Sequence, residues 1–460
     1  MKQLLAYCLS IILCVSFTGC MENYLDLYPE DKITSASFPE NESDIKLLLN
    51  GVYAQLREKE VYNQGLFGFG ITDGATPNAF NWGTDEVFNK LGAGRLSSSD
   101  GGVVTYRWKR CYEIISRANY LLACMDLVDL SEEAKAKYSG ETHFLRGLAY
   151  SVLAETYGGV PIILTNISTE EARSLKRASL EETWQQALDD YEVAITNLGV
   201  DAPEPGRATK GAALGMKMRA YLYQGKYKEV LSCVEQIDAL KKYGLFHSYE
   251  GLFDPANENN KEVLFDIQYI EGENSQGSYI DQYCGTGTGS WTRGSRYVPT
   301  DDLVAAYETI DGSPVDPENP YENRDPRLGF TAVLPGSYFL GYRFPNYLYP
   351  GGAFNHAGNR LKHLSTRKYR IQDESKLPPS GQSYINDIIL RYADVLLSKA
   401  EAIIETNGSV ADAIAILNRI RTERDDVKIS LLPTSMSREE AREKVRHERR
   451  IELALEGRYW

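Results

Sequence analysis

The sequence predicts a mostly helical protein in which pairs of amphipathic helices form a scaffold for a long, loop-rich region. Three observations support this fold class. Apolar residues recur at helical spacing in two paired stretches, one in each half of the chain. Between these stretches, residues 244–383 are dense in Gly, Pro, Asn, Asp and Tyr, and helical periodicity is weak. The composition, 43% hydrophobic and 25% charged over 460 residues, is that of a globular chain.

The clearest helix pair lies in residues 214–237. Its first apolar stripe ends at the turn Gln224-Gly225-Lys226, and a second stripe follows at once. A second pair has the same pattern and turns at Asn407-Gly408. A helix, a Gly-containing turn and a second helix are typical of tetratricopeptide-like repeats, although these copies have no fixed period. The stripes are formed by Leu214, Met218, Tyr221 and Leu222 with Tyr227, Val230, Leu231, Val234 and Ile237, and by Leu396, Ala400 and Ile403 with Ile414, Leu417 and Ile420.

The remaining periodicity predicts further elements. Helices are expected over 106–125, 143–157 and 180–198, and Gly158-Gly159 should stop the second of them. Trp108 and Trp184 fall on these helices and are expected in the core. The loop-rich region is predicted to contain a strand over 262–269 and a short helix near 303–307. Because scaffolds with long irregular loops usually carry function on those loops, this region is the first place to look for a site.

The formal net charge is −14, and an acidic chain repels phosphate backbones, which argues against nucleic acid as a partner. Basic residues are dispersed along the chain. The densest cluster, Arg446 to Arg450, contains Glu448 and is typical of a solvated helix face.

The first twenty residues have the pattern of a targeting signal. A short positive start precedes the apolar run Leu4–Phe17, and small residues then lead directly into Cys20. This resembles a bacterial lipobox, which predicts a signal peptide over 1–19 and acyl chains on Cys20; the alternative is an ordinary secretory signal. No later stretch is apolar for long enough to span a bilayer. The mature chain is divided into a helical region, 20–243, and a region that is loop-rich and then helical, 244–460.

Enzyme motifs are missing from the sequence. It contains no HExxH, GxSxG or GxxxxGK[ST], so no catalytic residue, metal ion or cofactor is predicted. Cys111, Cys124, Cys233 and Cys284 have no CxxC spacing, which argues against zinc and thioredoxin-like chemistry. His356 and His363 could share a metal, but no further ligand stands at a suitable spacing. Hydrolysis of a glycoside requires only two nearby carboxylates, and no motif here indicates such a pair.

Two segments combine aromatic and polar residues in the way a sugar site requires, since a ring face packs on the sugar and polar groups bind its hydroxyls. They are Asp73–Trp82 and Tyr283–Tyr297. An alternative is that Trp82 and Trp291 fill the junction between loops and scaffold. A third aromatic segment, Tyr338–Tyr349, could instead face a partner protein. The candidate ligand-binding residues are Asn78, Asn81, Trp82, Tyr283, Trp291 and Arg293.

Several blocks, in a fixed order, resemble the SusD/RagB family of lipoproteins. Together they extend over nearly the whole chain. They are Leu25-Asp26 with Pro29 and Ile33-Thr34, His143–Tyr150 with Tyr157–Pro161, Asn323–Leu328, Arg391–Leu397 with Ala400–Ala402 and Leu417–Arg421, and Glu448–Leu453 with Glu456–Trp460. Family members continue beyond the position of Trp460, so the chain is expected to be a fragment.

The resemblance implies four tetratricopeptide-like helix pairs that support a ligand face. It also implies a binding protein on the outer surface of a Bacteroidota-type outer membrane, held there by its lipid anchor. Such proteins cap a SusC-like TonB-dependent transporter and deliver oligosaccharides to it. A peptide-binding, RagB-type lid of the transporter is the alternative, and a surface glycoside hydrolase is a third reading.

Overall fold

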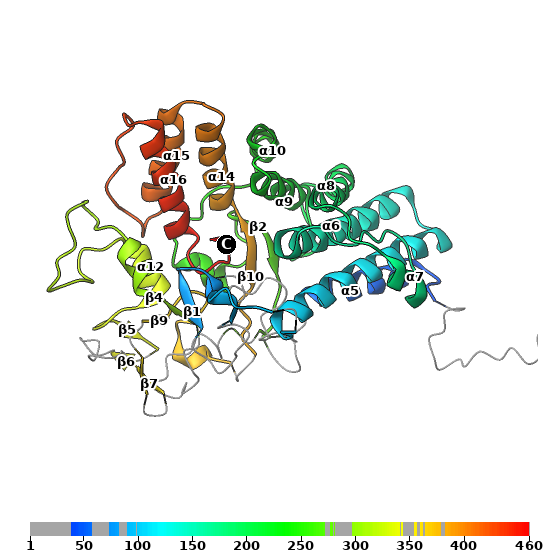
Figure 1. The fold of residues 1–460 in the computed structure, drawn as a ribbon, viewed down its shortest axis with the longest axis horizontal. Helices are drawn as coiled ribbons and strands as arrows, with labels where there is room; N and C mark the ends of the chain where they lie inside the picture. Colours follow the sequence, from blue (N-terminus) through cyan, green and yellow to red (C-terminus); the bar gives the residue numbers. More distant parts are fainter. Residues whose placement is uncertain are drawn as a thin grey trace, which may run out of the picture.

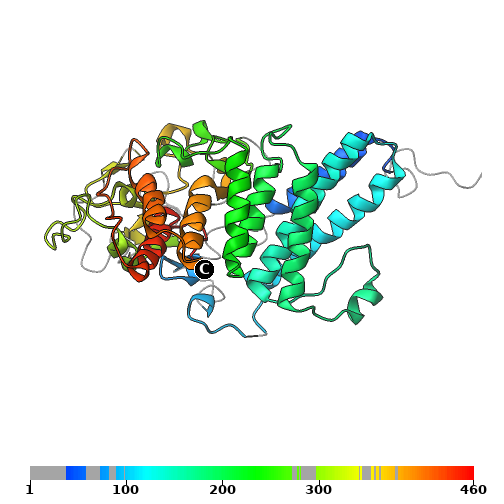
Figure 2. The same ribbon diagram turned by 90° about the horizontal axis from the view of Figure 1, so that it is seen from above.

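A computed structural model describes most of the chain, and in it the protein is mostly helical, as predicted. The helices follow one another in a row from the cyan N-terminal pair to the orange and red C-terminal helices (Figures 1 and 2). The described residues are 38–57, 73–81, 90–97, 99–271, 277, 278, 280, 297–340, 342, 343, 354–356, 359–361, 364–378 and 382–459.

The N-terminal half contains the three single helices that the periodicity predicts. The predicted helix over 143–157 begins earlier than expected, because Ser131 caps the first turn and good helix formers fill the residues that follow. Trp184 is buried, and Trp108 packs between the rings of Tyr112 and Tyr157 at centroid distances of 5.0 and 5.2 Å. The helices are α2 (Glu42–Ala54), α5 (Val103–Cys124), α6 (Glu132–Tyr157), α7 (Thr169–Ser174) and α8 (Leu180–Asn197).

Both predicted helix pairs are confirmed. The first consists of α9 (Lys210–Tyr223) and α10 (Tyr227–Ala239), and the second of α14 (Tyr392–Glu405) and α15 (Val410–Thr422). Each turn contains a residue with positive φ, Gly225 at 67° and Asn407 at 61°, which is why Gly and Asn stand there. Helix α10 packs against α14, so the two pairs are neighbours in space although they are far apart in the sequence.

Two glycines stop α6 as expected, for different physical reasons. Gly158 has a φ of 74°, a conformation that residues with a Cβ rarely adopt. A Cβ on Gly159 would lie 2.1 Å from the carbonyl oxygen of Ala178. The chain therefore passes close to the segment that precedes α8, and the backbone N–H of Val160 then donates to Thr183 Oγ1 at 3.1 Å.

Two antiparallel strands lie at the start and the end of the loop-rich region and pair with each other. Strand β2 (Val263–Ile267) lies inside the predicted strand and pairs with β10 (Asp387–Arg391), so the region leaves and re-enters the scaffold at one place. The described residues also form short strands and two short helices that are not part of the helical scaffold. They are β1 (Ala79–Asn81), β3 (Tyr297–Pro299), α12 (Asp301–Ala306), α13 (Pro326–Thr331), β4 (Ala332–Val333), β5 (Tyr338–Phe339), β6 (Tyr342–Arg343), β7 (Phe354–His356), β8 (Asn359–Leu361) and β9 (Ser365–Thr366).

The charge cluster Arg446 to Arg450 lies in helix α16 (Arg438–Glu452), and its surroundings differ from the solvated helix face expected for it. Arg446 is exposed, but Glu448 is buried and Arg449 Nη2 donates to the buried Asp394 at 2.7 Å. The helix packs against both α14 and α15, so only part of its circumference faces solvent. The charge cluster therefore pairs with other elements, and the prediction of a wholly solvated face is wrong.

A buried network of charges joins α16 to the rest of the C-terminal region. The Glu452 carboxylate lies within 2.8 Å of Arg327, 2.6 Å of Arg391 and 2.9 Å of Arg424. Glu448, one turn earlier, accepts from Arg327 at 2.7 Å. Burial alone would raise the pKa of Glu452, but the three guanidinium groups outweigh it and hold that pKa well below its ordinary value.

Candidate functional site

The two segments that the sequence singles out meet at one strand pair. Strand β1 is antiparallel to β3, with Ala79 opposite Pro299 and Asn81 opposite Tyr297. Strand β1 lies in the first segment, and β3 begins at the last residue of the second. More than 200 residues separate the strands in the sequence. The structure therefore brings the ends of the two predicted ligand loops together, and we call this place the β1–β3 junction.

Asn78 lies immediately before β1 and is 1% exposed. Its Oδ1 accepts a hydrogen bond from Arg450 Nε at 2.7 Å, and its carbonyl oxygen accepts one from the backbone N–H of Thr300 at 3.1 Å. Asn81 ends β1. Trp82, Tyr283, Trp291 and Arg293 lie outside the described residues, as does Cys20.

Asp73 fixes the start of the first loop and was not singled out from the sequence. Its Oδ2 accepts from the backbone N–H of Gly457 at 2.6 Å, and its carbonyl oxygen accepts from the hydroxyl of Thr76 at 2.9 Å. Burial raises the pKa of Asp73 to about 7, although the bond from Gly457 opposes that shift. The side chain thus joins the first loop to the segment that follows α16.

Strand β1 carries an exposed aromatic ring that was not among the residues predicted from the sequence. Ala79 is buried, whereas the next residue, Phe80, is 45% exposed. Side chains alternate between the two faces of a strand, so the order Ala-Phe-Asn could have indicated an outward ring. In β5, Tyr338 is also exposed while Phe339 is buried, which leaves a tyrosine ring on the surface of the third aromatic segment.

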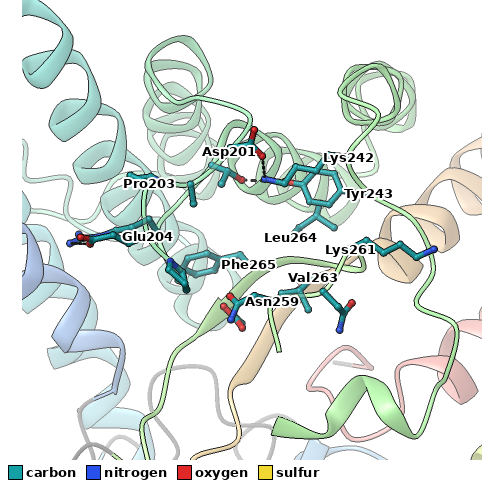
Figure 3. Close-up of a pocket in the computed structure, with 17 residues that line it drawn as sticks. Asp201, Pro203, Glu204, Lys242, Tyr243, Asn259, Lys261, Val263, Leu264 and Phe265 are labelled. Carbon is teal, nitrogen blue, oxygen red and sulfur yellow. Dashed lines mark hydrogen bonds and ion pairs between the residues drawn. The ribbon is translucent and has the colours of Figure 1, made fainter. Parts of the chain in front are cut away.

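A separate polar pocket of about 460 Å³ opens between the α8–α9 loop, the residues after α10 and strand β2 (Figure 3). Lys242 Nζ donates to Asp201 Oδ1 at 2.9 Å and to the carbonyl oxygen of Val200 at 2.8 Å. The Tyr243 and Thr209 hydroxyls lie 3.2 Å apart. These hydrogen bonds hold the side chains that line the pocket against one another. The pocket lies beside the scaffold helices, and none of the predicted ligand residues is among those that line it.

The described residues give no indication of metal or thiol chemistry. No three His, Cys, Asp or Glu side chains in this part of the chain are grouped so as to hold a metal ion. Cys111, Cys124 and Cys233 are free and buried, and burial raises the pKa of the Cys111 thiol to about 12. His143 Nδ1 lies 2.8 Å from the carbonyl oxygen of Ser139 within α6.

Comparisons with protein families give matches over most of the chain. Residues 261–460 match the model of the SusD family, and residues 23–222 match a related model described as starch-binding and associating with the outer membrane. The chain belongs to the SusD family. The resemblance seen in the sequence is thereby confirmed, and so is the mostly helical fold.

Relatives of the SusD family match this chain along nearly its whole length. A SusD-like protein of Formosa agariphila is 25% identical over 99% of this chain and 88% of that protein. The crystal structure of a SusD-like carbohydrate-binding protein of Bacteroides fragilis is 28% identical, with a TM-score of 0.80 over 91% of this chain and 85% of that one. A laminarin-binding SusD-like protein, 21% identical with a TM-score of 0.70 over 91% of this chain and 90% of that one, shares the fold.

Three of the SusD-family blocks meet in three dimensions. Arg327 comes from the block Asn323–Leu328, Arg391 begins the next, and Glu452 lies in the last, yet all three join the buried charge network. These three blocks therefore hold the C-terminal region together, and none of them contains a predicted ligand residue. No helix in the described part of the chain is both long and apolar enough to cross a bilayer.

Proposed function

We propose that this SusD-family protein binds an oligosaccharide at the β1–β3 junction and delivers it to a SusC-like TonB-dependent transporter. The observation that carries the proposal is the pairing of β1 with β3, which brings together the ends of two segments rich in aromatic and polar residues, in a chain whose relative from Bacteroides fragilis is a carbohydrate-binding protein. Sugars bind well where an exposed ring lies beside hydrogen-bonding side chains. Phe80, Trp82 and Trp291 are the candidate rings.

In this proposal the ligand residues divide into two groups. Asn81, Trp82, Tyr283, Trp291 and Arg293 contact the sugar, whereas the buried Asn78 supports the loop from within. The protein binds its ligand and does not hydrolyse it. Residues 1–19 are the signal peptide, and acyl chains on Cys20 hold the body, 20–243 and 244–460, at the outer face of the outer membrane.

The second candidate function is a lid on the transporter that leaves ligand selectivity, for glycan or peptide, to the barrel. The exposed ring of Tyr338 favours it, because aromatic residues are enriched at protein interfaces. The two functions predict different consequences for different rings, so one set of variants separates them.

The test is electrophoresis in native gels that contain starch, laminarin or another neutral polysaccharide. The wild type should be retarded by at least one of them, and the Trp82→Ala, Trp291→Ala double variant should migrate as in a gel without glycan. Tyr338→Ala is the matched control, an aromatic residue removed outside the junction, and it should be retarded like the wild type. Retardation that survives the double variant would contradict the proposed site. The lid function would be supported if the wild type binds no glycan or peptide but co-purifies with a SusC-like transporter, and if Tyr338→Ala no longer co-purifies with that transporter.

A further inference from the structure

Arg450 makes contacts with both sides of the β1–β3 junction. Its Nε donates to Asn78 Oδ1 at 2.7 Å, and its Nη2 donates to Asp302 Oδ2, also at 2.7 Å. Asn78 immediately precedes β1, and Asp302 lies in the first turn of α12, directly after β3. One guanidinium group on α16 therefore holds the two loop ends, and we call this arrangement the Arg450 bridge.

The chemistry of arginine suits this bridge. A planar guanidinium presents several N–H groups in fixed directions, so it can bind two acceptors from different elements, whereas a single ammonium lacks this fixed geometry. The side chain of Arg450 is only 17% exposed, and its partner Asn78 is almost wholly buried. Water competes little for that bond. Asp302 is 67% exposed, so its ion pair is the weaker half.

Other contacts hold the guanidinium and the first loop in place. The Arg450 guanidinium carbon lies 5.3 Å from the ring centroid of Tyr459, within the range of a cation–π contact. Two residues before Tyr459, the backbone N–H of Gly457 donates to Asp73. The first loop is thus attached at two points, Asp73 and Asn78, to α16 and the segment that follows it.

We propose that Arg450 is a positioning residue for the ligand: through Asn78 and Asp302 it sets the separation of the two ligand loops, and so the affinity for glycan. The proposal rests on the proposed function, because it concerns the same site. Arg450 does not touch the sugar in this account. It acts by holding the β1–β3 junction, where the ends of the two loops meet, in one arrangement, so less conformational entropy is lost at that junction when the ligand binds.

The first test measures hydrogen–deuterium exchange in the protein without ligand. In Arg450→Gln, amides of residues 77–81 and 297–303 should exchange faster together, because a glutamine amide cannot donate to both partners in the same geometry. Arg446→Gln is the matched control, an exposed arginine one turn earlier that pairs only with Glu443 among the ion pairs of the described residues. It should leave both segments unchanged. Unchanged exchange in Arg450→Gln would overturn the proposal.

The second test measures glycan affinity by calorimetry, with the polysaccharide that retards the wild type. Arg450→Gln should bind about tenfold more weakly, since it loses a charge-assisted bond, and the exposed Asp302→Asn about threefold more weakly. Arg450→Glu and Asp302→Arg should each weaken binding. The double variant Arg450→Glu, Asp302→Arg should bind within about threefold of the wild type. The two charges have then exchanged places, and the Asn78 side-chain amide can turn so that its NH₂ group donates to the new carboxylate at position 450.

The outcomes separate a positioning role from a structural one. Loss of affinity in Arg450→Gln, with recovery in the reversed pair, supports the bridge. A lower melting temperature with no recovery in the reversed pair would overturn it and make Arg450 a residue of the fold. If the wild type binds no glycan, the proposed function fails, while the exchange experiment still reports on the bridge.

Discussion

Glu452→Gln is the substitution that most directly tests how α16 is held in place. The side chain keeps its size but loses its charge at a fully buried position where three guanidinium groups converge. Three charge-assisted hydrogen bonds would together contribute roughly 5–9 kcal/mol if each were lost outright. Each arginine keeps a second carboxylate, however: Arg327 keeps Glu448, and both Arg391 and Arg424 keep Glu262.

The expected loss in the free energy of unfolding is therefore smaller, about 3–5 kcal/mol, the usual result of removing one member of a buried ion pair. The measurement is urea denaturation followed by circular dichroism at pH 7. Glu443→Gln is the matched control on the same helix, because Glu443 is exposed and pairs only weakly with Arg446. It should change stability by less than about 0.5 kcal/mol.

The pH dependence has a definite sign. Because the folded pKa of Glu452 lies below its unfolded value, its carboxylate contributes stability above the unfolded pKa and loses it as the pH falls toward the folded pKa. The wild type should therefore lose stability on acidification below about pH 5, and Glu452→Gln should lose less over the same range. A variant as stable as Glu443→Gln at pH 7 would refute the view that this network stabilises the fold.

Two further predictions concern the first ligand loop and the end of α6. Burial raises the pKa of Asp73 to about 7, so its side chain lowers stability progressively as the pH rises from about 4, its ordinary pKa, to about 7. Asp73→Asn should then be more stable than the wild type at pH 8.5, by up to about 4 kcal/mol, and the gain should shrink toward pH 4; an equal gain at both pH values would contradict the assignment. Gly159→Ala should lower the free energy of unfolding by about 1–3 kcal/mol, since the new Cβ meets the Ala178 carbonyl oxygen. A melting temperature equal to the wild type's would show that the chain can move apart there.

Most of the scaffold could be predicted because most of its helices carry a local sequence signal. The stripe from Tyr227 to Ile237 repeats at helical spacing, and Gly225 marks the turn before it, so both α9 and α10 follow from a short stretch of sequence. Helix α2 was missed. It buries Ile45, Leu49 and Val52, three positions that follow helical spacing, but the segment lies in a stretch whose composition did not single it out.

The geometry of the candidate site could not be predicted from the sequence, because it depends on contacts between distant segments. Composition identified the loop around Asn78, but not that its amide faces inward to Arg450, more than 370 residues away. The same limit explains the error at α16. A run of alternating charges is usually solvated, and nothing local shows that Arg327 and Arg391 supply buried partners for Glu448 and Glu452.

The charge network and the Arg450 bridge are linked by their positions on α16. Glu448 and Glu452 lie one turn apart on the buried side, and Arg450 lies midway between them in sequence, so it projects toward a different side of the helix. Rotating α16 by one residue position, about 100°, would remove Glu452 from its arginines and Arg450 from Asn78 together. Apolar side chains can repack around such a change, whereas hydrogen bonds between fixed charges cannot. We therefore expect the network to determine the rotational setting of α16, and through Arg450 the geometry of the β1–β3 junction. In the proposed function, loops from distant parts of the chain bind one ligand, and α16, a helix whose buried side is charged, gives the ends of those loops a fixed position.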